Sequence, residues 1–187
     1  ITIRRGFEIS SNNVFRMLAA KYYSAEPDTF LDYLTNRLHI TQDFPFELKG
    51  FSHANLKSTQ SRSWSPADLP QIGMGYTVEI TPLHTLNFYN ALANNGVMVR
   101  PHLIRNFQKD GAVIKEFPTE VLATVCKPET ALKVREAMRG VVEHEGGTGY
   151  RVFKGCPVHV AGKTGTARIV FPGTGSYQDR YGRKMHQ

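Results

Sequence analysis

Apolar and polar residues follow one another along this chain in two periods, one typical of helices and the other of strands. Several segments place apolar residues at helical spacing behind a polar cap or a proline, which is how helices commonly begin. The first three predicted helices cover about 13–23, about 27–38 and 81–95. A fourth begins at Pro128 and ends at the glycine-rich stretch that starts at Gly146. Short runs of β-branched and aromatic residues predict strands at 1–5, 97–99, 103–107, 113–117 and 158–171. Residues 41–70 show neither period and are predicted to form surface loops.

Two of the predicted helices are apolar on nearly all sides. The first follows the polar cluster Ser10–Asn13, and the second has Thr81 as its expected N-cap and Pro82 as its first residue. A helix without a polar face is buried on most sides, so we expect both to be buried and the second to be the centre of a helical layer. Asp110 and Gly111 separate two strand runs and predict a β-hairpin.

The predicted strand 158–171 contains a glycine, Gly165, between two threonines. A glycine weakens a strand but lets a ligand or another backbone lie directly against it. Lys163 adds a positive charge beside it, so this edge suits an extended peptide whose carboxylate is held by the hydroxyls of Thr164 and Thr166. The alternative is that Gly165 marks a β-bulge and Lys163 is a solvated surface charge, and the pentapeptide alone leaves both interpretations open.

Length and composition restrict the class of protein. A chain of 187 residues with 41% hydrophobic content can form one domain with a core. The net charge of +7 suits an acidic partner such as nucleic acid, an anionic membrane surface or a cell-wall polymer, but the basic residues are scattered, which disfavours nucleic acid. Cys126 and Cys156 lack partners at metal-ligand spacing, so we expect buried free thiols and no metal. No stretch approaches the length of apolar residues that a membrane span needs.

Two motifs at opposite ends of the chain resemble a known pair. Ser10-Ser11-Asn12 matches Ser-x-Asn, and Lys163-Thr164-Gly165 matches Lys-Thr-Gly. The chain thereby resembles the penicillin-binding proteins, specifically the transpeptidase domain of the class B, cell-division or elongation type. Three further segments resemble the same family in the same order, so the resemblance covers essentially the whole chain: Gly73 to Leu83, Ala91 to Gly96 and Gly147 to Gly149.

The resemblance implies an α+β fold of the penicillin-binding-protein and β-lactamase type, with a helical layer and an antiparallel sheet that contains the lysine strand. One family motif is missing. None of the serines in the sequence is followed three positions later by lysine, so the Ser-x-x-Lys motif that carries the nucleophile is not present. We therefore expect residues 1–187 to be an internal fragment of a transpeptidase domain, truncated at both ends.

The resemblance also implies a chemistry for the residues that are present. The parent would be a serine-type D-Ala-D-Ala transpeptidase that forms an acyl-serine intermediate from peptidoglycan stem peptides and reacts with β-lactams without a cofactor. Ser10 would relay protons and Asn12 would orient the substrate amide. Lys163 would stabilise charge and attract the terminal carboxylate, and the hydroxyls of Thr164 and Thr166 would bind it. Gly165 would belong to the same substrate-binding segment. The backbone N–H of Thr166 would supply half of an oxyanion hole.

The family implies a catalytic domain on the extracytoplasmic, periplasmic face of the bacterial inner membrane, anchored by a segment outside this sequence, with division or elongation proteins as partners and no nucleic acid. Two other functions fit the same motifs. One is a β-lactamase-like hydrolase, and the other is a non-catalytic domain that senses β-lactams or peptides or scaffolds a division complex. Without a nucleophile motif, we expect the isolated chain not to react with penicillin.

Overall fold

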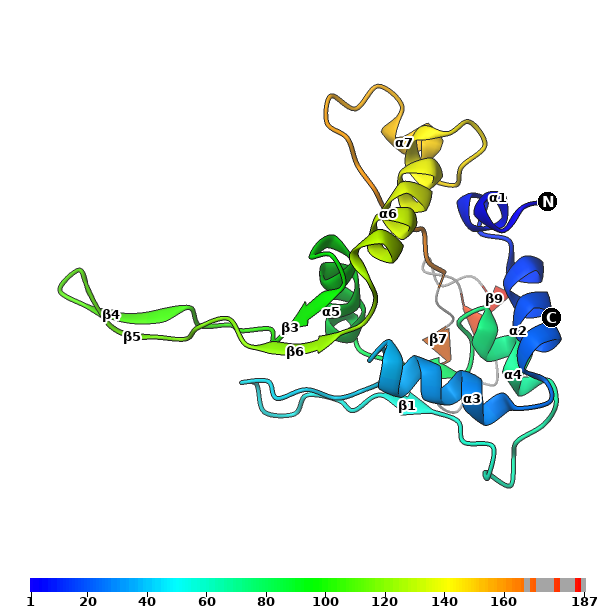
Figure 1. The fold of residues 1–187 in the computed structure, drawn as a ribbon, viewed down its shortest axis with the longest axis horizontal. Coiled ribbons are helices and arrows are strands. Elements are labelled where there is room, and N and C mark those ends of the chain that lie inside the picture. The colour runs from blue at the N-terminus through cyan, green and yellow to red at the C-terminus, as the bar shows by residue number, and fades with distance from the viewer. Residues whose placement is uncertain (167–168, 171–176, 179–183, 186–187) are drawn as a thin grey trace.

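A computed structural model describes residues 1–166, 169–170, 177–178 and 184–185 of the chain. The helices gather in one body, and the two-stranded β4–β5 hairpin projects from it (Figure 1). The helices are α1 Ile3–Glu8, α2 Asn12–Tyr23, α3 Pro27–Asp32, which continues as the π-helix η1 Tyr33–Arg37, α4 Asp68–Gly73, α5 Pro82–Ala93, α6 Pro128–Glu143 and α7 Tyr150–Phe153. Among the described residues, no helix combines the length and the apolar character that crossing a membrane requires.

The strands pair in small antiparallel sheets. They are β1 Asn55–Leu56, β2 Val78–Glu79, β3 Val97–Val99, β4 Asn106–Lys109, β5 Ala112–Glu116, β6 Val121–Thr124, β7 Ile169–Val170, β8 Tyr177–Gln178 and β9 Lys184–Met185. β1 pairs with β2, β3 with β6, β4 with β5, and β8 lies between β7 and β9. The mixture of helices and antiparallel strands confirms the expected α+β class.

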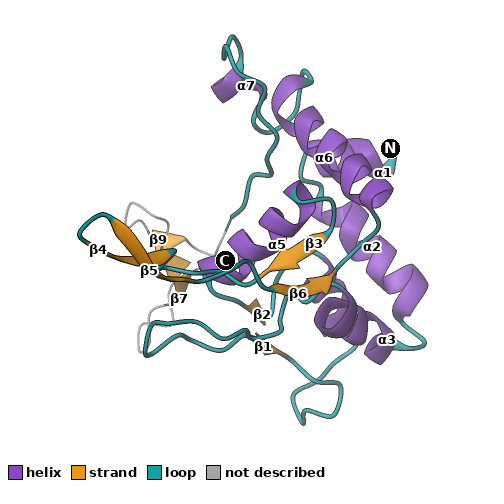
Figure 2. Ribbon diagram, turned by 60° about the vertical axis from the view of Figure 1, so that its left-hand side comes forward, coloured by secondary structure: helices purple, strands orange, loops and turns teal. Residues whose placement is uncertain are grey.

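The core of this body lies where α5 meets the β3–β6 pair (Figure 2). Ala91, Met98 and Val125 are buried together there. Thr81 caps α5 as expected: its hydroxyl accepts a hydrogen bond from the backbone N–H of His84, whose side chain lies back against Thr81. At Gly96, with φ of +90°, a Cβ atom would lie 2.1 Å from the carbonyl oxygen of Cys126, so only glycine fits.

The local signals of the β4–β5 hairpin also produce the expected structure. Asp110 and Gly111 both have positive φ, 51° and 81°. These values are those of a type I′ turn, whose twist matches that of the flanking strands.

Two expectations for the N-terminal part are wrong. Residues 1–5 were expected to form a strand, but Ile3–Glu8 is helical, because the Thr2 hydroxyl accepts a hydrogen bond from the Arg5 N–H and so caps the helix. α2 forms, yet only Ala19 is buried in it, and Met17 is 67% exposed. Its apolar residues extend around the helix, but its neighbours among the described elements, α1, α3 and α4, leave much of its surface uncovered.

The expected strand at 158–171 is also wrong over most of its length. Residues 158–166 are neither helix nor strand, and among the described residues of the range only Ile169–Val170 is paired, with β8; positions 167, 168 and 171 lie outside the described residues. A strand needs a partner, and 158–166 has none among the described residues; the N–H of Gly162 instead donates to the carbonyl oxygen of Met138 in α6. Both cysteines are free thiols as expected, but neither is buried: Cys126 is half-buried and Cys156 is exposed.

Candidate active site

Ser10 lies in the tight turn between α1 and α2. Its φ is +55°, in the left-handed region, and its N–H donates to the carbonyl oxygen of Phe7 at 3.1 Å. The N-cap of α2 is the next residue, Ser11, and no side-chain hydrogen bond completes that cap. Ser10 therefore belongs to neither helix, and its hydroxyl is not used to cap α2.

Lys163 reaches this hydroxyl from the other end of the chain. Its Nζ donates to Ser10 Oγ at 2.7 Å and to the carbonyl oxygen of Thr164 at 2.9 Å. The ammonium lies 5.7 Å from the centre of the Phe7 ring, which favours a cation over its face. Burial lowers the pKa of Lys163, and no carboxylate among the described residues is paired with it. The site therefore holds a partly desolvated positive charge that an anionic ligand can neutralise.

Thr164 contacts the glycine-rich loop that follows α6. The hydroxyls of Thr148 and Thr164 are 2.7 Å apart, and the N–H of Thr148 donates to the carbonyl oxygen of Glu8 at 3.1 Å. The loop passes close to α6, since a Cβ atom on Gly147 would lie 2.4 Å from the carbonyl oxygen of Val141. Thr148 thus touches both the segment that carries Ser10 and the segment that carries Lys163.

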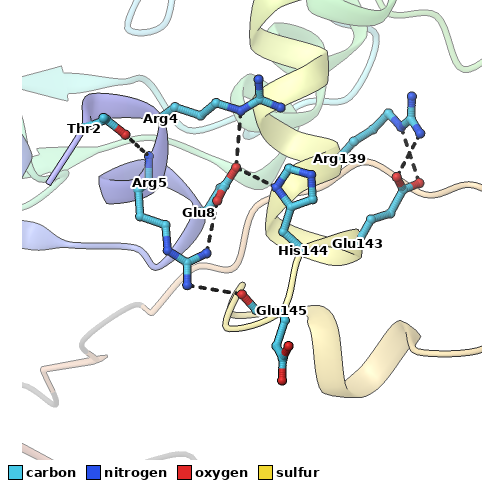
Figure 3. A network of polar contacts seen from close by, with 8 residues as sticks. All are labelled: Thr2, Arg4, Arg5, Glu8, Arg139, Glu143, His144 and Glu145. Carbon is cyan, nitrogen blue, oxygen red and sulfur yellow. Dashed lines mark hydrogen bonds and ion pairs between the residues drawn. The ribbon is translucent and has the colours of Figure 1, made fainter.

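Glu8, whose carbonyl oxygen accepts the hydrogen bond from Thr148, is also the centre of a cluster of charged side chains (Figure 3). Glu8 is only 4% exposed and accepts hydrogen bonds from Arg5 at 3.1 Å, Arg4 at 3.3 Å and His144 at 2.9 Å. Burial alone raises the pKa of Glu8, but the hydrogen bonds from Arg5, His144 and Arg4 and the charge interaction with His144 together outweigh burial, and the pKa is lowered. Arg5 also donates to the carbonyl oxygen of Glu145 at 3.2 Å, so the cluster joins α1 to the end of α6.

Sequence reasoning missed this cluster. The spacing of Arg4 and Arg5 from Glu8 is a helical ion-pair signal, but it fell in a segment expected to be a strand. Nothing in the sequence pointed to His144, whose partner lies 136 residues away.

The other expected site residues are exposed and lie in the same two segments as Ser10 and Lys163. Asn12 is the first residue of α2 and is exposed, as are Gly165 and Thr166. No heavy atom lies within 4 Å of the place where a Cβ on Gly165 would be, so this backbone is open to a ligand. The structure therefore brings Ser10, Lys163 and Thr164 into hydrogen-bond contact and leaves Asn12, Gly165 and Thr166 facing solvent.

The arrangement suits proton transfer beside an anion site. Because the Lys163 ammonium donates to Ser10 Oγ, the hydroxyl proton of Ser10 is directed away from Lys163 and can be given to another group. The same ammonium and the Thr164 hydroxyl can bind a carboxylate. Within the part of the chain that is described, no group of three or more His, Cys, Asp or Glu side chains is placed to hold a metal ion.

Comparison with known proteins identifies the family of the chain. The family model of the penicillin-binding protein transpeptidase domain matches residues 1–184. The chain is 27% identical over 174 residues to the peptidoglycan D,D-transpeptidase MrdA of Salmonella typhimurium, a match that covers 90% of the chain and 28% of that protein. It is 35% identical over 123 residues to the penicillin-binding protein PbpB of Mycobacterium tuberculosis, covering 62% of the chain and 18% of the relative.

Solved structures give the same result. The crystal structure of penicillin-binding protein 3 from Mycobacterium tuberculosis in complex with aztreonam superimposes with a TM-score of 0.76 at 30% identity, over 95% of this chain and 39% of that one. The transpeptidase domain of a peptidoglycan glycosyltransferase from Eggerthella lenta has a TM-score of 0.76 at 24% identity, over 91% of this chain and 42% of that one. The chain spans less than a third of the length of the curated relatives named above.

Proposed function

The chain belongs to the penicillin-binding protein transpeptidase family, and we propose that it forms part of a peptidoglycan D,D-transpeptidase that cross-links cell-wall stem peptides. The observation that carries the proposal is the 2.7 Å hydrogen bond from Lys163 Nζ to Ser10 Oγ, which joins the two motif segments. In this proposal the domain acts on the D-Ala-D-Ala end of a stem peptide and is acylated by β-lactams.

The proposed reaction needs a serine nucleophile, which attacks the carbonyl carbon of the penultimate D-Ala and displaces the terminal D-Ala as an amine. The nucleophile loses a proton and the leaving amine gains one. Ser10 suits this transfer because Lys163 donates a hydrogen bond to a lone pair of Ser10 Oγ. The hydroxyl proton of Ser10 then stays free to be donated to another group. The Lys163 ammonium also lowers the energy of negative charge that develops on Ser10 during the transfer.

The remaining site residues take roles around the substrate. Asn12, which has both a donor and an acceptor, would hold the substrate amide. Thr164 and Thr166 would bind the terminal carboxylate, with Gly165 leaving room for the substrate backbone. The N–H of Thr166 would donate to the oxyanion of the tetrahedral intermediate.

The nucleophile itself would come from outside these 187 residues, since no Ser-x-x-Lys motif occurs in them. We place the domain on the extracytoplasmic face of the inner membrane, where stem peptides and β-lactams are met, with division or elongation proteins as partners. The names of the relatives, a D,D-transpeptidase and a penicillin-binding protein, support this setting.

Labelling with a fluorescent penicillin on a denaturing gel tests the proposal. In a longer protein that combines this chain with its serine nucleophile, Ser10→Ala and Lys163→Ala should each slow covalent labelling by about 10²- to 10⁴-fold. Labelling at the wild-type rate in both variants would contradict the assigned roles.

The isolated 187-residue chain should not be labelled, because it lacks the nucleophile motif. Stoichiometric labelling of it would show that another residue serves as nucleophile. In the longer protein, transfer of the acyl group to an added D-amino acid would separate a transpeptidase from a hydrolase, which passes it to water, and from a sensor, which retains it.

A further inference from the structure

The glycine-rich loop carries a hydroxyl that the proposed mechanism does not use. We propose that Thr148 is a positioning residue, which donates its hydroxyl proton to Thr164 Oγ1 and so turns the Thr164 hydroxyl proton toward the carboxylate of the ligand. This inference rests on the proposed function and adds a determinant of specificity for the carboxyl end of the substrate.

The contact between the two hydroxyls has two states. They are 2.7 Å apart, and either oxygen can be the donor. If Thr164 donates to Thr148, its only proton is used within the protein and a carboxylate finds no donor there. If Thr148 donates to Thr164, the Thr164 proton is free for the ligand. A carboxylate only accepts hydrogen bonds, so its binding selects the second state.

Lys163 does not perform this orienting task. Its Nζ is 3.5 Å from Thr164 Oγ1, whereas it makes short contacts with Ser10 Oγ at 2.7 Å and with the Thr164 carbonyl oxygen at 2.9 Å. The Thr148 hydroxyl is therefore the stronger of the two partners of the Thr164 hydroxyl.

Thr148 is held more firmly than the residue it orients. Its N–H is bonded to the carbonyl oxygen of Glu8, and the N–H groups of Gly147 and Gly149 donate to carbonyl oxygens of α6 and its cap at 2.9 Å each. Both glycines are buried, while Thr148 between them is exposed. Thr164 lies in an irregular segment that has no strand partner in the described part of the chain. The fixed loop can thus set the direction of a hydroxyl on a segment that has few restraints of its own.

The test compares two ligands that differ only at the carboxyl end, acetyl-D-alanyl-D-alanine and its C-terminal amide, in NMR titrations of the 187-residue chain. The wild type should bind the acid more tightly than the amide. Thr148→Val should weaken binding of the acid about three- to tenfold, which corresponds to one neutral hydrogen bond, and leave binding of the amide unchanged. Thr148→Ser should retain the wild-type preference because it keeps the hydroxyl.

Thr164→Val provides a second arm. If Thr148 acts through Thr164, the double variant should bind the acid no more weakly than Thr164→Val alone. An equal loss for acid and amide in Thr148→Val would assign the residue a structural role, and an unchanged preference would show that water orients Thr164 equally well. Either result overturns the inference while the proposed function stands. Wild-type chain that binds neither ligand would overturn the inference, whereas the proposed function is decided by penicillin labelling of the longer protein.

Discussion

Lys163 is a half-buried ammonium whose partners in the described structure are uncharged oxygens and an aromatic ring. Desolvation disfavours its charged form, so its pKa should lie below the ordinary value of 10.5. A titration of the Lys163 Cε resonance by NMR measures this directly. A pKa at or above 10.5 would mean that an anionic partner, not burial, controls the charge of the site.

Glu8 should make stability depend on pH in the acid range. Its folded-state pKa is below the value of 4.5 expected for an unfolded chain, so the ionised form stabilises the fold above about pH 4.5, and this contribution is lost as the pH falls through the folded pKa. Glu8→Gln should lower the free energy of unfolding at pH 7 by about 1–3 kcal/mol, the cost of weakening hydrogen bonds to charged groups.

Denaturant unfolding at several pH values checks this prediction. The Glu8→Gln variant should lose less stability than the wild type between neutral pH and acid. Glu116→Gln is the control, since Glu116 is exposed in β5. Parallel pH profiles for the wild type and Glu8→Gln would show that the ionisation of Glu8 contributes nothing to stability in this pH range.

At the level of elements, the packing of α1 against α6 depends on Gly140. A Cβ atom at this position would lie 2.3 Å from Glu8 Oε1 and 3.0 Å from His144 Nδ1. Alanine normally stabilises a helix interior by about 1 kcal/mol relative to glycine. Here the clash should outweigh that gain, because three partners hold the Glu8 carboxylate and it cannot move aside without losing them.

We therefore expect Gly140→Ala to be destabilising by about 1–3 kcal/mol, as overpacked sites commonly are. Gly162→Ala is the matched control, since no heavy atom lies within 4 Å of the place where its Cβ would be and its φ is not positive. Thermal unfolding of both variants measures the difference. A more stable Gly140→Ala would mean that α1 can shift away from α6 at little cost.

The elements that were predicted correctly are those with local signals. Thr81 and Pro82 start α5, and Asp110 and Gly111 turn the hairpin, because capping and positive φ act over a few residues. The expected strand at 158–171 was wrong over residues 158–166, because strand formation depends on a partner that the sequence does not reveal.

The candidate site shows the same division. The Ser-x-Asn and Lys-Thr-Gly motifs identified Ser10 and Lys163, although no periodicity relates residues 153 positions apart. Glu8 and Thr148 belong to neither motif, and the resemblance gave neither of them a chemical role. Their partners are brought to them only by the packing of α1, α6 and the loop that follows it, so they required the structure.

At the scale of the whole molecule, the β4–β5 hairpin stands apart from the helical body (Figures 1 and 2). Its strands pair only with each other among the described elements, so both outer edges keep unpaired backbone groups. Large apolar side chains on it are exposed, including Phe107 at 45%, Val113 at 53% and Ile114 at 65%. Open edges and exposed apolar residues together favour pairing with a second chain.

We therefore expect the isolated chain to self-associate as its concentration rises, and the hairpin to be the main contact. Size-exclusion chromatography with light scattering should show Ile114→Lys shifting the chain toward monomer, since a charge on an edge opposes strand addition. Val152→Lys, on exposed α7, should have no effect. A contact through the lysine segment, residues 163–170, is the alternative, and Val170→Lys in β7 tests it. A monomer produced by Val170→Lys but not by Ile114→Lys would place the contact at the lysine segment. A chain that is monomeric without any substitution would show that neither edge pairs strongly enough to hold two chains together.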